Sequence, residues 1–123
     1  MNFIDDNHEK FYEQKIKELK CKDSYTQSLI YLLSMNKDTR KHFESIYNIA
    51  NNEINIDSLK EAWQTNSSLS ICRLAFNLFN GLASDNPETE NVSFKYDVSS
   101  LFCNQNTKYY FEAIKIRFVE DTK

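Results

Sequence analysis

Three consecutive residues, Arg40-Lys41-His42, are the clearest candidates for binding an anion. They fall near the start of an expected helix, where unpaired backbone N–H groups add partial positive charge. A small anionic ligand needs such a combination of side-chain and backbone donors. The same triplet also fits an ordinary hydrated helix surface, and the sequence alone leaves both interpretations open.

Trp63 is a second candidate, as an aromatic anchor for a binding partner. It stands at the end of a short expected helix, beside the polar turn 66–68. Buried aromatic side chains supply much of the binding energy of many interfaces. Trp63 could equally be a core residue that fills one end of a helix bundle. Together with Tyr47, Arg40 and Arg73 it could line a pocket that binds a nucleotide by stacking and charge.

Patterns that carry catalysis or bind metals are missing from the sequence. There is no glycine-rich phosphate loop, no H-E-x-x-H and no G-x-S-x-G. The cysteines at 21, 72 and 103 form no C-x-x-C pair, and neither His8 nor His42 lies at metal-ligand spacing from them. We therefore expect free, mostly buried cysteines and no metal, cofactor, catalytic residue or enzyme activity.

The charge distribution argues against nucleic acid as a partner. The chain has a formal net charge of −3, and residues 42–105 hold three basic residues against eight acids. Binding to a phosphate backbone needs clustered Lys and Arg, which this chain lacks. The acidic middle is either a solvated surface or a surface offered to a basic groove of a partner.

Composition and length favour one helical domain. The 123 residues are 41% hydrophobic and 14% aromatic, which is too apolar for a disordered tail. One Gly and one Pro argue against an all-β fold rich in tight turns. The longest apolar runs are far shorter than the roughly 20 residues of a membrane span. The acidic start has no apolar segment typical of a secretory signal, so we expect a cytoplasmic protein with no membrane contact.

Apolar spacing predicts the helices of the first half. Asp5, Asp6 or Asn7 caps the first, and Asp23 or Ser24 caps a second that is largely buried. A third helix begins near Asp38 or Thr39 and continues to Ala50, followed by a loop at 51–56. A short fourth helix begins at Asp57 and carries Leu59, Ala62 and Trp63.

The second half is predicted to contain the central helix. Residues 68–80 are apolar nearly all round, as expected in the middle of a bundle, and Gly81 fits the residue that ends such a helix. A polar loop follows at 82–97. Asp97 then caps a short helix through Cys103, and Asn106 or Thr107 caps the last one. The sequence thus predicts an all-α fold: residues 1–123 as a compact single-domain bundle of five to seven helices around 68–80.

Five segments of the chain carry a resemblance to a known family; in chain order they are Met1–Tyr12, Ile54–Leu59, Ala62–Thr65, Arg73–Asn80 and Leu101–Cys103. These segments resemble a family of small, uncharacterised phage and prophage proteins from low-GC Gram-positive bacteria. The resemblance implies an origin in a mobile element. It implies no activity, so no catalytic residue can be carried over.

Two functional expectations follow. The first is a non-enzymatic phage protein that binds a host protein in the cytoplasm, most plausibly to inhibit a defence system such as CRISPR interference. The alternative is a small-molecule binder that sequesters a nucleotide defence signal. A structural role in the virion is a third option. The apolar helix 68–80 could also be buried across a homodimer interface.

Overall fold

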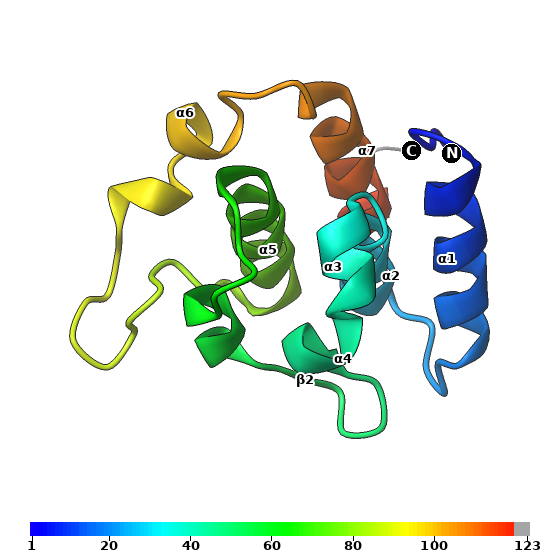
Figure 1. Cartoon of the computed structure of the whole chain (residues 1–123), viewed down its shortest axis with the longest axis horizontal. Coiled ribbons are helices and arrows are strands. Elements are labelled where there is room, and N and C mark those ends of the chain that lie inside the picture. Colours follow the sequence, from blue (N-terminus) through cyan, green and yellow to red (C-terminus); the bar gives the residue numbers. More distant parts are fainter. Residues whose placement is uncertain (120–123) are drawn as a thin grey trace.

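The computed structural model describes residues 1–119, which form a predominantly helical fold with one small β-hairpin (Figure 1). The elements of this part of the chain are α1 (Asp6–Lys17), α2 (Ser24–Leu33), α3 (Lys37–Lys41), α4 (Phe43–Ile46), β1 (Tyr47–Asn48), β2 (Glu53–Ile54), η1 (Ile56–Lys60), α5 (Asn66–Asn80), η2 (Phe94–Tyr96), α6 (Val98–Leu101) and α7 (Thr107–Arg117), where η marks a 3-10 helix. None of the helices within residues 1–119 has the length and apolar character that crossing a membrane requires.

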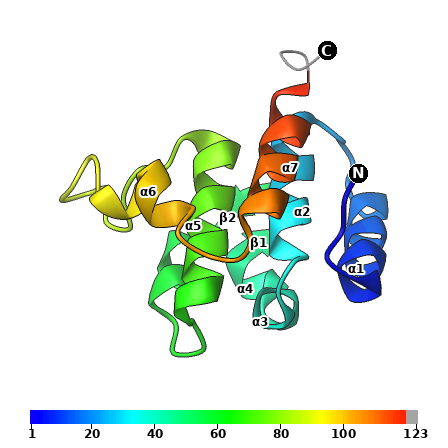
Figure 2. The same cartoon turned by 90° about the horizontal axis from the view of Figure 1, so that it is seen from above.

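The helices form a row when they are viewed from above (Figure 2). α1 lies at one end, α2 and α7 come next, α5 follows, and α6 lies at the other end. The core is formed where α2 packs against α5 and α7. Residues 29–33 of α2 are completely buried, and α5 adds a second buried set: Ile71, Cys72, Leu74, Ala75, Phe76 and Leu78.

Polar caps define the ends of the helices much as the sequence predicts. The Asp5 carboxylate accepts the backbone N–H of His8 at the start of α1, and Asp23 accepts that of Thr26 at the start of α2. Thr65 forms a capping box with Ser68, so α5 begins at Asn66, two residues earlier than expected. Gly81, in the left-handed conformation, ends α5. These local signals determine where α1, α2 and α5 begin.

The prediction of an all-α fold is wrong at residues 47–54. Instead of one helix that continues to Ala50 and a loop, the chain forms α3 and α4, separated at His42, and then an antiparallel hairpin of β1 and β2. The Tyr47 ring is buried, and its hydroxyl donates to the Asn52 side chain at 2.6 Å. Asn52 has a φ of 55°, which asparagine tolerates better than most residues. Burial of Tyr47 in the core therefore accompanies an extended backbone in place of the predicted helix.

The predicted fourth helix is also shorter than expected. Residues 56–60 form the 3-10 helix η1, capped by Asn55 rather than Asp57, and the chain becomes extended at Glu61. Trp63 therefore lies beyond the helix and not on it.

His8 is a completely buried side chain that ties the N-terminal segment to the core. Its Nδ1 accepts the backbone N–H of Ile4 at 3.1 Å, and its Nε2 lies 2.9 Å from the carbonyl oxygen of Tyr31. Because a backbone N–H only donates and a carbonyl only accepts, these partners assign the neutral ring with its proton on Nε2. Burial lowers the pKa of His8 below its ordinary value, although the hydrogen bond to Tyr31 opposes this effect.

We expect part of the pH dependence of stability to come from His8. Below its ordinary pKa of 6.5, the unfolded chain binds a proton that the folded protein does not. As the pH decreases below 6.5, the free energy of unfolding therefore falls by up to about 1.4 kcal/mol per pH unit. The fall ends when the pH passes the lower pKa that His8 has in the folded state. Above 6.5 both states are neutral and this contribution is constant. Urea unfolding between about pH 7 and pH 5 should show the added slope in the wild type and not in His8→Gln. Equal slopes would contradict this prediction.

At Gly81 the energetic cost of a left-handed backbone can be measured without a side-chain clash. Its φ is 81°, yet a Cβ added there would meet no atom within 4 Å. Gly81→Ala should therefore lower the free energy of unfolding by about 1–2 kcal/mol through backbone conformation alone. Gly81→Asn should cost less, because asparagine adopts this conformation more readily. Chemical denaturation of the three proteins measures the difference, and an alanine variant as stable as the wild type would refute it.

Candidate functional site

An ion pair between Arg73 and Asp85 anchors the polar loop 82–97 to α5. The Nε and Nη2 atoms of Arg73 donate to the two carboxylate oxygens of Asp85, at 3.1 Å and 2.7 Å. The two side chains are only 16% and 14% exposed, so water competes little for this contact. The hydroxyl of Tyr96, in η2, donates to the same carboxylate at 2.7 Å. The two ends of the predicted loop are thereby held together against the central helix.

The electrostatics of this cluster favour its ionised form. Burial by itself would raise the pKa of Asp85, but the hydrogen bonds from Arg73 and Tyr96 outweigh burial and hold the pKa below its ordinary value. Burial and the neighbouring carboxylate raise the pKa of Tyr96. At neutral pH the cluster therefore holds a carboxylate, a guanidinium and a neutral phenol.

A second set of bonds stiffens the loop between its ends. The backbone N–H of Ser93 donates to the carbonyl of Ala83 at 2.8 Å. Ser84 is completely buried, and its hydroxyl donates to Glu90. The loop that the sequence predicts at 82–97 is thus an ordered segment that contains the short helix η2.

Three large apolar side chains at the end of this segment and the start of α6 point into solvent. Val92, Phe94 and Val98 are 71%, 71% and 72% exposed, more than any other large hydrophobic residue among positions 1–119. We call these three residues the apolar ridge. They fall within seven consecutive positions, on both sides of the anchored Tyr96.

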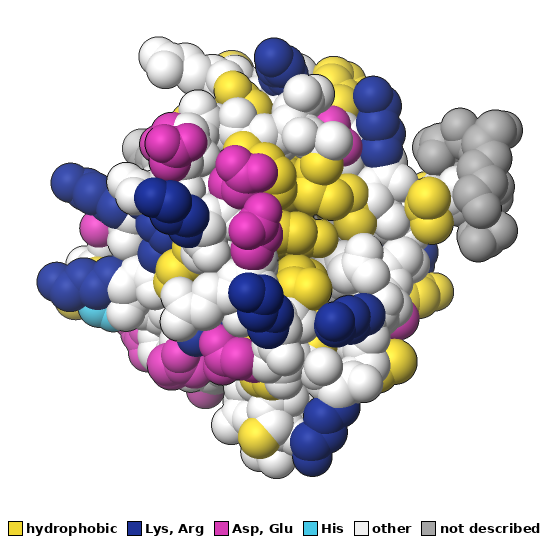
Figure 3. All heavy atoms as spheres, turned by 90° about the vertical axis from the view of Figure 1, so that its right-hand side faces the viewer, with side chains coloured by type: hydrophobic (Ala, Val, Ile, Leu, Met, Phe, Trp, Pro, Cys, Tyr) yellow, Lys and Arg dark blue, Asp and Glu magenta, His cyan; other side chains and the backbone are white. Residues whose placement is uncertain are grey.

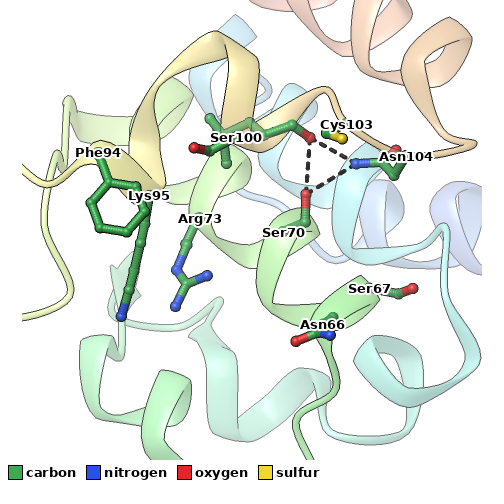
Figure 4. Close-up of a pocket in the computed structure, with 10 residues that line it drawn as sticks. Asn66, Ser67, Ser70, Arg73, Phe94, Lys95, Ser100, Cys103 and Asn104 are labelled. Carbon is green, nitrogen blue, oxygen red and sulfur yellow. Dashed lines mark hydrogen bonds between the residues drawn. The ribbon is translucent and has the colours of Figure 1, made fainter.

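A depression of about 400 Å³ lies beside the ridge, between the first half of α5 and the segment 94–104 (Figure 4). At its back the side-chain amide of Asn104 donates to the Ser70 hydroxyl at 3.3 Å and to the carbonyl of Leu101 at 2.7 Å. Ser70 also lies 2.9 Å from the Tyr110 hydroxyl. On the side of the depression away from Asn104, the side chains of Arg73 and Lys95 point in the same direction (Figure 4).

The residues of the predicted anion site make mostly structural contacts. The Nη1 atom of Arg40 donates to the carbonyl of Ser34 at 2.8 Å, just after α2. Lys41 is exposed to solvent. The half-buried His42 ring stacks on Trp63, with centroids 4.3 Å apart and an interplanar angle of 9°. The indole N–H of Trp63 donates to Glu61 at 2.7 Å.

The four residues predicted to share a nucleotide pocket have four different partners. Arg73 binds Asp85, Arg40 binds a carbonyl after α2, the Tyr47 hydroxyl binds Asn52, and Trp63 binds Glu61. Only Arg73 lines the depression beside the ridge. A binding role for Trp63, Arg40, Lys41, His42 and Tyr47 stays a prediction.

Of the residues that build this surface, the sequence predicted a binding role only for Arg73. The spacing of Arg73, Asp85 and Tyr96 follows no motif, because they come together only when α5 and the loop pack. One signal was available: a long polar loop that still contains Val92, Phe94 and Tyr96. Large apolar side chains in such a loop indicate either anchoring or recognition.

The cysteines differ from expectation in their burial. All three are free, as predicted, but only Cys72 is buried, whereas Cys21 and Cys103 are exposed. Burial raises the pKa of Cys72 to about 12, so its thiol is protonated at neutral pH. Within residues 1–119, no group of three or more His, Cys, Asp or Glu side chains is placed to hold a metal ion.

We expect loss of the Asp85 carboxylate to loosen the segment 82–97 selectively. Asp85→Ala leaves the Arg73 guanidinium without its partner in a poorly solvated place, which should cost about 1–3 kcal/mol of stability. Hydrogen exchange should show faster exchange of the amides of 82–97, while those of α2 keep their protection. Asp57→Ala, which removes an exposed carboxylate that makes no ion pair in the described structure, is the control. Unchanged exchange in Asp85→Ala would show that the ion pair does not hold the segment.

Comparison with known proteins identifies a family. The model of a family of unknown function, DUF6075, matches residues 1–123, the whole of this sequence. No curated protein and no solved structure matches the chain.

Proposed function

The chain belongs to this family of unknown function, and from its surface we propose that it is a non-enzymatic protein that binds a partner protein through the apolar ridge. The observation that carries the proposal is the exposure of Val92, Phe94 and Val98 on an ordered segment. Large apolar side chains that an ordered segment holds in solvent often mark a place where another protein docks, and these three fall within seven consecutive positions.

The ridge is well prepared for binding because its backbone is already held in place. Arg73 and Tyr96 bind Asp85 on one side, and the Ser93–Ala83 hydrogen bond closes the loop on the other. A segment that is ordered before binding loses less conformational entropy when the partner docks. An aromatic residue flanked by two valines suits the apolar centre of an interface.

The charges around the ridge favour a basic partner. Glu88, Glu90 and Asp97 are all exposed and flank the ridge residues in the sequence, with Lys95 as the one opposing charge of segment 88–98. Carboxylates at the rim of an interface attract a partner with lysine or arginine and accelerate its association. The partner we propose therefore presents an apolar pocket bordered by basic residues.

A second apolar area, on the face that carries α1, is less suited to this role. Figure 3 shows hydrophobic side chains gathered in the middle of that face, among acidic and basic ones. On α1 itself, Phe11 and Ile16 are partly buried and pack against the core. They offer less free apolar surface than the ridge.

The more specific form of the proposal comes from the sequence resemblance. It is that the protein originates from a phage and inhibits a host defence system, such as CRISPR interference, in the cytoplasm of the host. The alternative, sequestration of a nucleotide signal by Trp63, Tyr47, Arg40 and Arg73, has less support because these side chains have separate partners. A second copy of the chain is the other partner to consider, and light scattering of the purified protein distinguishes a homodimer from a monomer.

The double variant Val92→Asp/Val98→Asp should lose the partner while the fold stays intact. Both valines are exposed, so the added carboxylates are hydrated in the free protein. In the complex they would enter the apolar pocket of the partner, inside its basic border, and lose their hydration. Immobilised protein and a lysate of a low-GC Gram-positive bacterium provide the assay, with mass spectrometry of the retained proteins. We expect one or a few proteins that the wild type retains and the variant does not.

The matched control is Ala50→Asp/Asn51→Asp, which adds the same two charges at the exposed tip of the β-hairpin. It should retain the partner as the wild type does. Equal retention by the ridge variant, or loss in both variants, would contradict a contact through the ridge.

A further inference from the structure

The depression beside the ridge differs in charge from the depression next to the β-hairpin. Its lining includes two cationic side chains, Arg73 and Lys95, and no acid. A comparable depression of about 340 Å³ next to the hairpin is lined by Asp57, Asp85 and Glu88 against Lys60. Asp85 compensates the charge of Arg73, so the excess positive charge of the first depression comes from Lys95. The first depression therefore suits an anion better than the second, where three acids oppose one lysine.

Arg73 is held rigidly at the edge of this depression. The ion pair with Asp85 uses its Nε and Nη2 atoms, and no described residue accepts a hydrogen bond from Nη1. A guanidinium whose position is set by one carboxylate can still donate to a second anion through its remaining N–H groups. Lys95 adds a full positive charge that forms no ion pair with any described residue.

Neutral hydrogen-bonding groups complete the lining. Asn66, Ser67 and Ser100 line the depression, and within residues 1–119 none of their side chains has a hydrogen-bonding partner. Hydroxyl and amide groups can pair with the hydroxyls of a sugar or with the polar edge of a base. A bare inorganic anion would leave most of these groups unused.

Phe94 supplies an aromatic surface beside the two cations. Its ring is 71% exposed and stands next to the Lys95 side chain at one side of the depression (Figure 4). Stacking of a planar base on such a ring contributes about 1–3 kcal/mol to binding in proteins that hold single-stranded nucleic acid. The volume of about 400 Å³ lies in the range of small-molecule sites, roughly 300–1,000 Å³.

We propose that this depression binds a nucleoside monophosphate, with the phosphate on Arg73 and Lys95 and the base stacked on Phe94. The ribose would lie towards Ser100, which belongs to the same wall of the depression, 94–104, as Phe94. This site differs from the nucleotide pocket predicted from the sequence, since it shares with it only Arg73. It does not depend on the proposed protein contact, because its evidence is the charge and lining of the depression.

Isothermal titration calorimetry with adenosine and guanosine monophosphates tests the proposal. We expect saturable binding that weakens about tenfold in Lys95→Gln, which removes one charged hydrogen bond to the phosphate. It should weaken at least about fivefold in Phe94→Ala, which removes the stacking surface. Both residues are exposed, so the variants should fold. Lys60→Gln, which removes an exposed lysine from the acidic depression, is the control and should bind as the wild type does.

Three simpler probes show which parts of the nucleotide are recognised. Inorganic phosphate, adenosine and phenyl phosphate should each bind more weakly than the nucleotides, because each lacks part of the proposed contacts. Phosphate or phenyl phosphate that binds as tightly as the nucleotides would overturn the assignment to a nucleotide. The site would be overturned if neither nucleotide gave heat on titration, or if Lys95→Gln and Phe94→Ala bound the nucleotides as tightly as the wild type. A failure here leaves the capture experiment on Val92 and Val98 unaffected, so the two proposals fail separately.

Discussion

A bidentate ion pair links the central helix to the segment 82–97, which follows it. Arg73 belongs to α5, whose other faces are buried in the core, and Asp85 belongs to the loop that follows. Because Tyr96 donates to the same carboxylate, one acid holds both ends of the segment 85–96. Because the pair is largely buried, water competes little for its hydrogen bonds. Because each charge faces the opposite one, neither pays the full cost of a charge buried alone.

Both proposed binding features depend on this constraint. The apolar ridge keeps Val92, Phe94 and Val98 in solvent because their neighbours Ser93 and Tyr96 turn inward and are buried. The adjoining depression has Arg73 as one wall, and its guanidinium is aligned by Asp85. A flexible loop of the same composition would bury some of these apolar side chains and would define no depression.

Polar side chains inside the fold are used for structure. Within residues 1–119 every buried side-chain nitrogen or oxygen has a hydrogen-bonding partner. His8 links the N-terminal segment to Tyr31, and the Thr39 hydroxyl donates to the carbonyl of Leu33, the last residue of α2, at 2.7 Å. Such satisfied groups fix how the helices meet, because any other arrangement would leave one of them buried without a partner. Both ring nitrogens of His8 have backbone partners, so this buried histidine has a structural role and neither nitrogen is free to coordinate a metal.

The sequence by itself determined the features that depend on neighbouring residues. The caps Asp5 and Asp23, the end of α5 at Gly81 and the predominantly helical class all follow from short-range hydrogen bonding and apolar spacing. Tertiary structure decided the hairpin at 47–54, where burial of Tyr47 prevailed over helical spacing, and it decided which aromatic residues are exposed. It also decided the candidate site, because the contacts of Arg73 with Asp85 and of Asp85 with Tyr96 join residues more than ten positions apart. Local patterns cannot specify such pairs, since they form only when the core has brought the segments together.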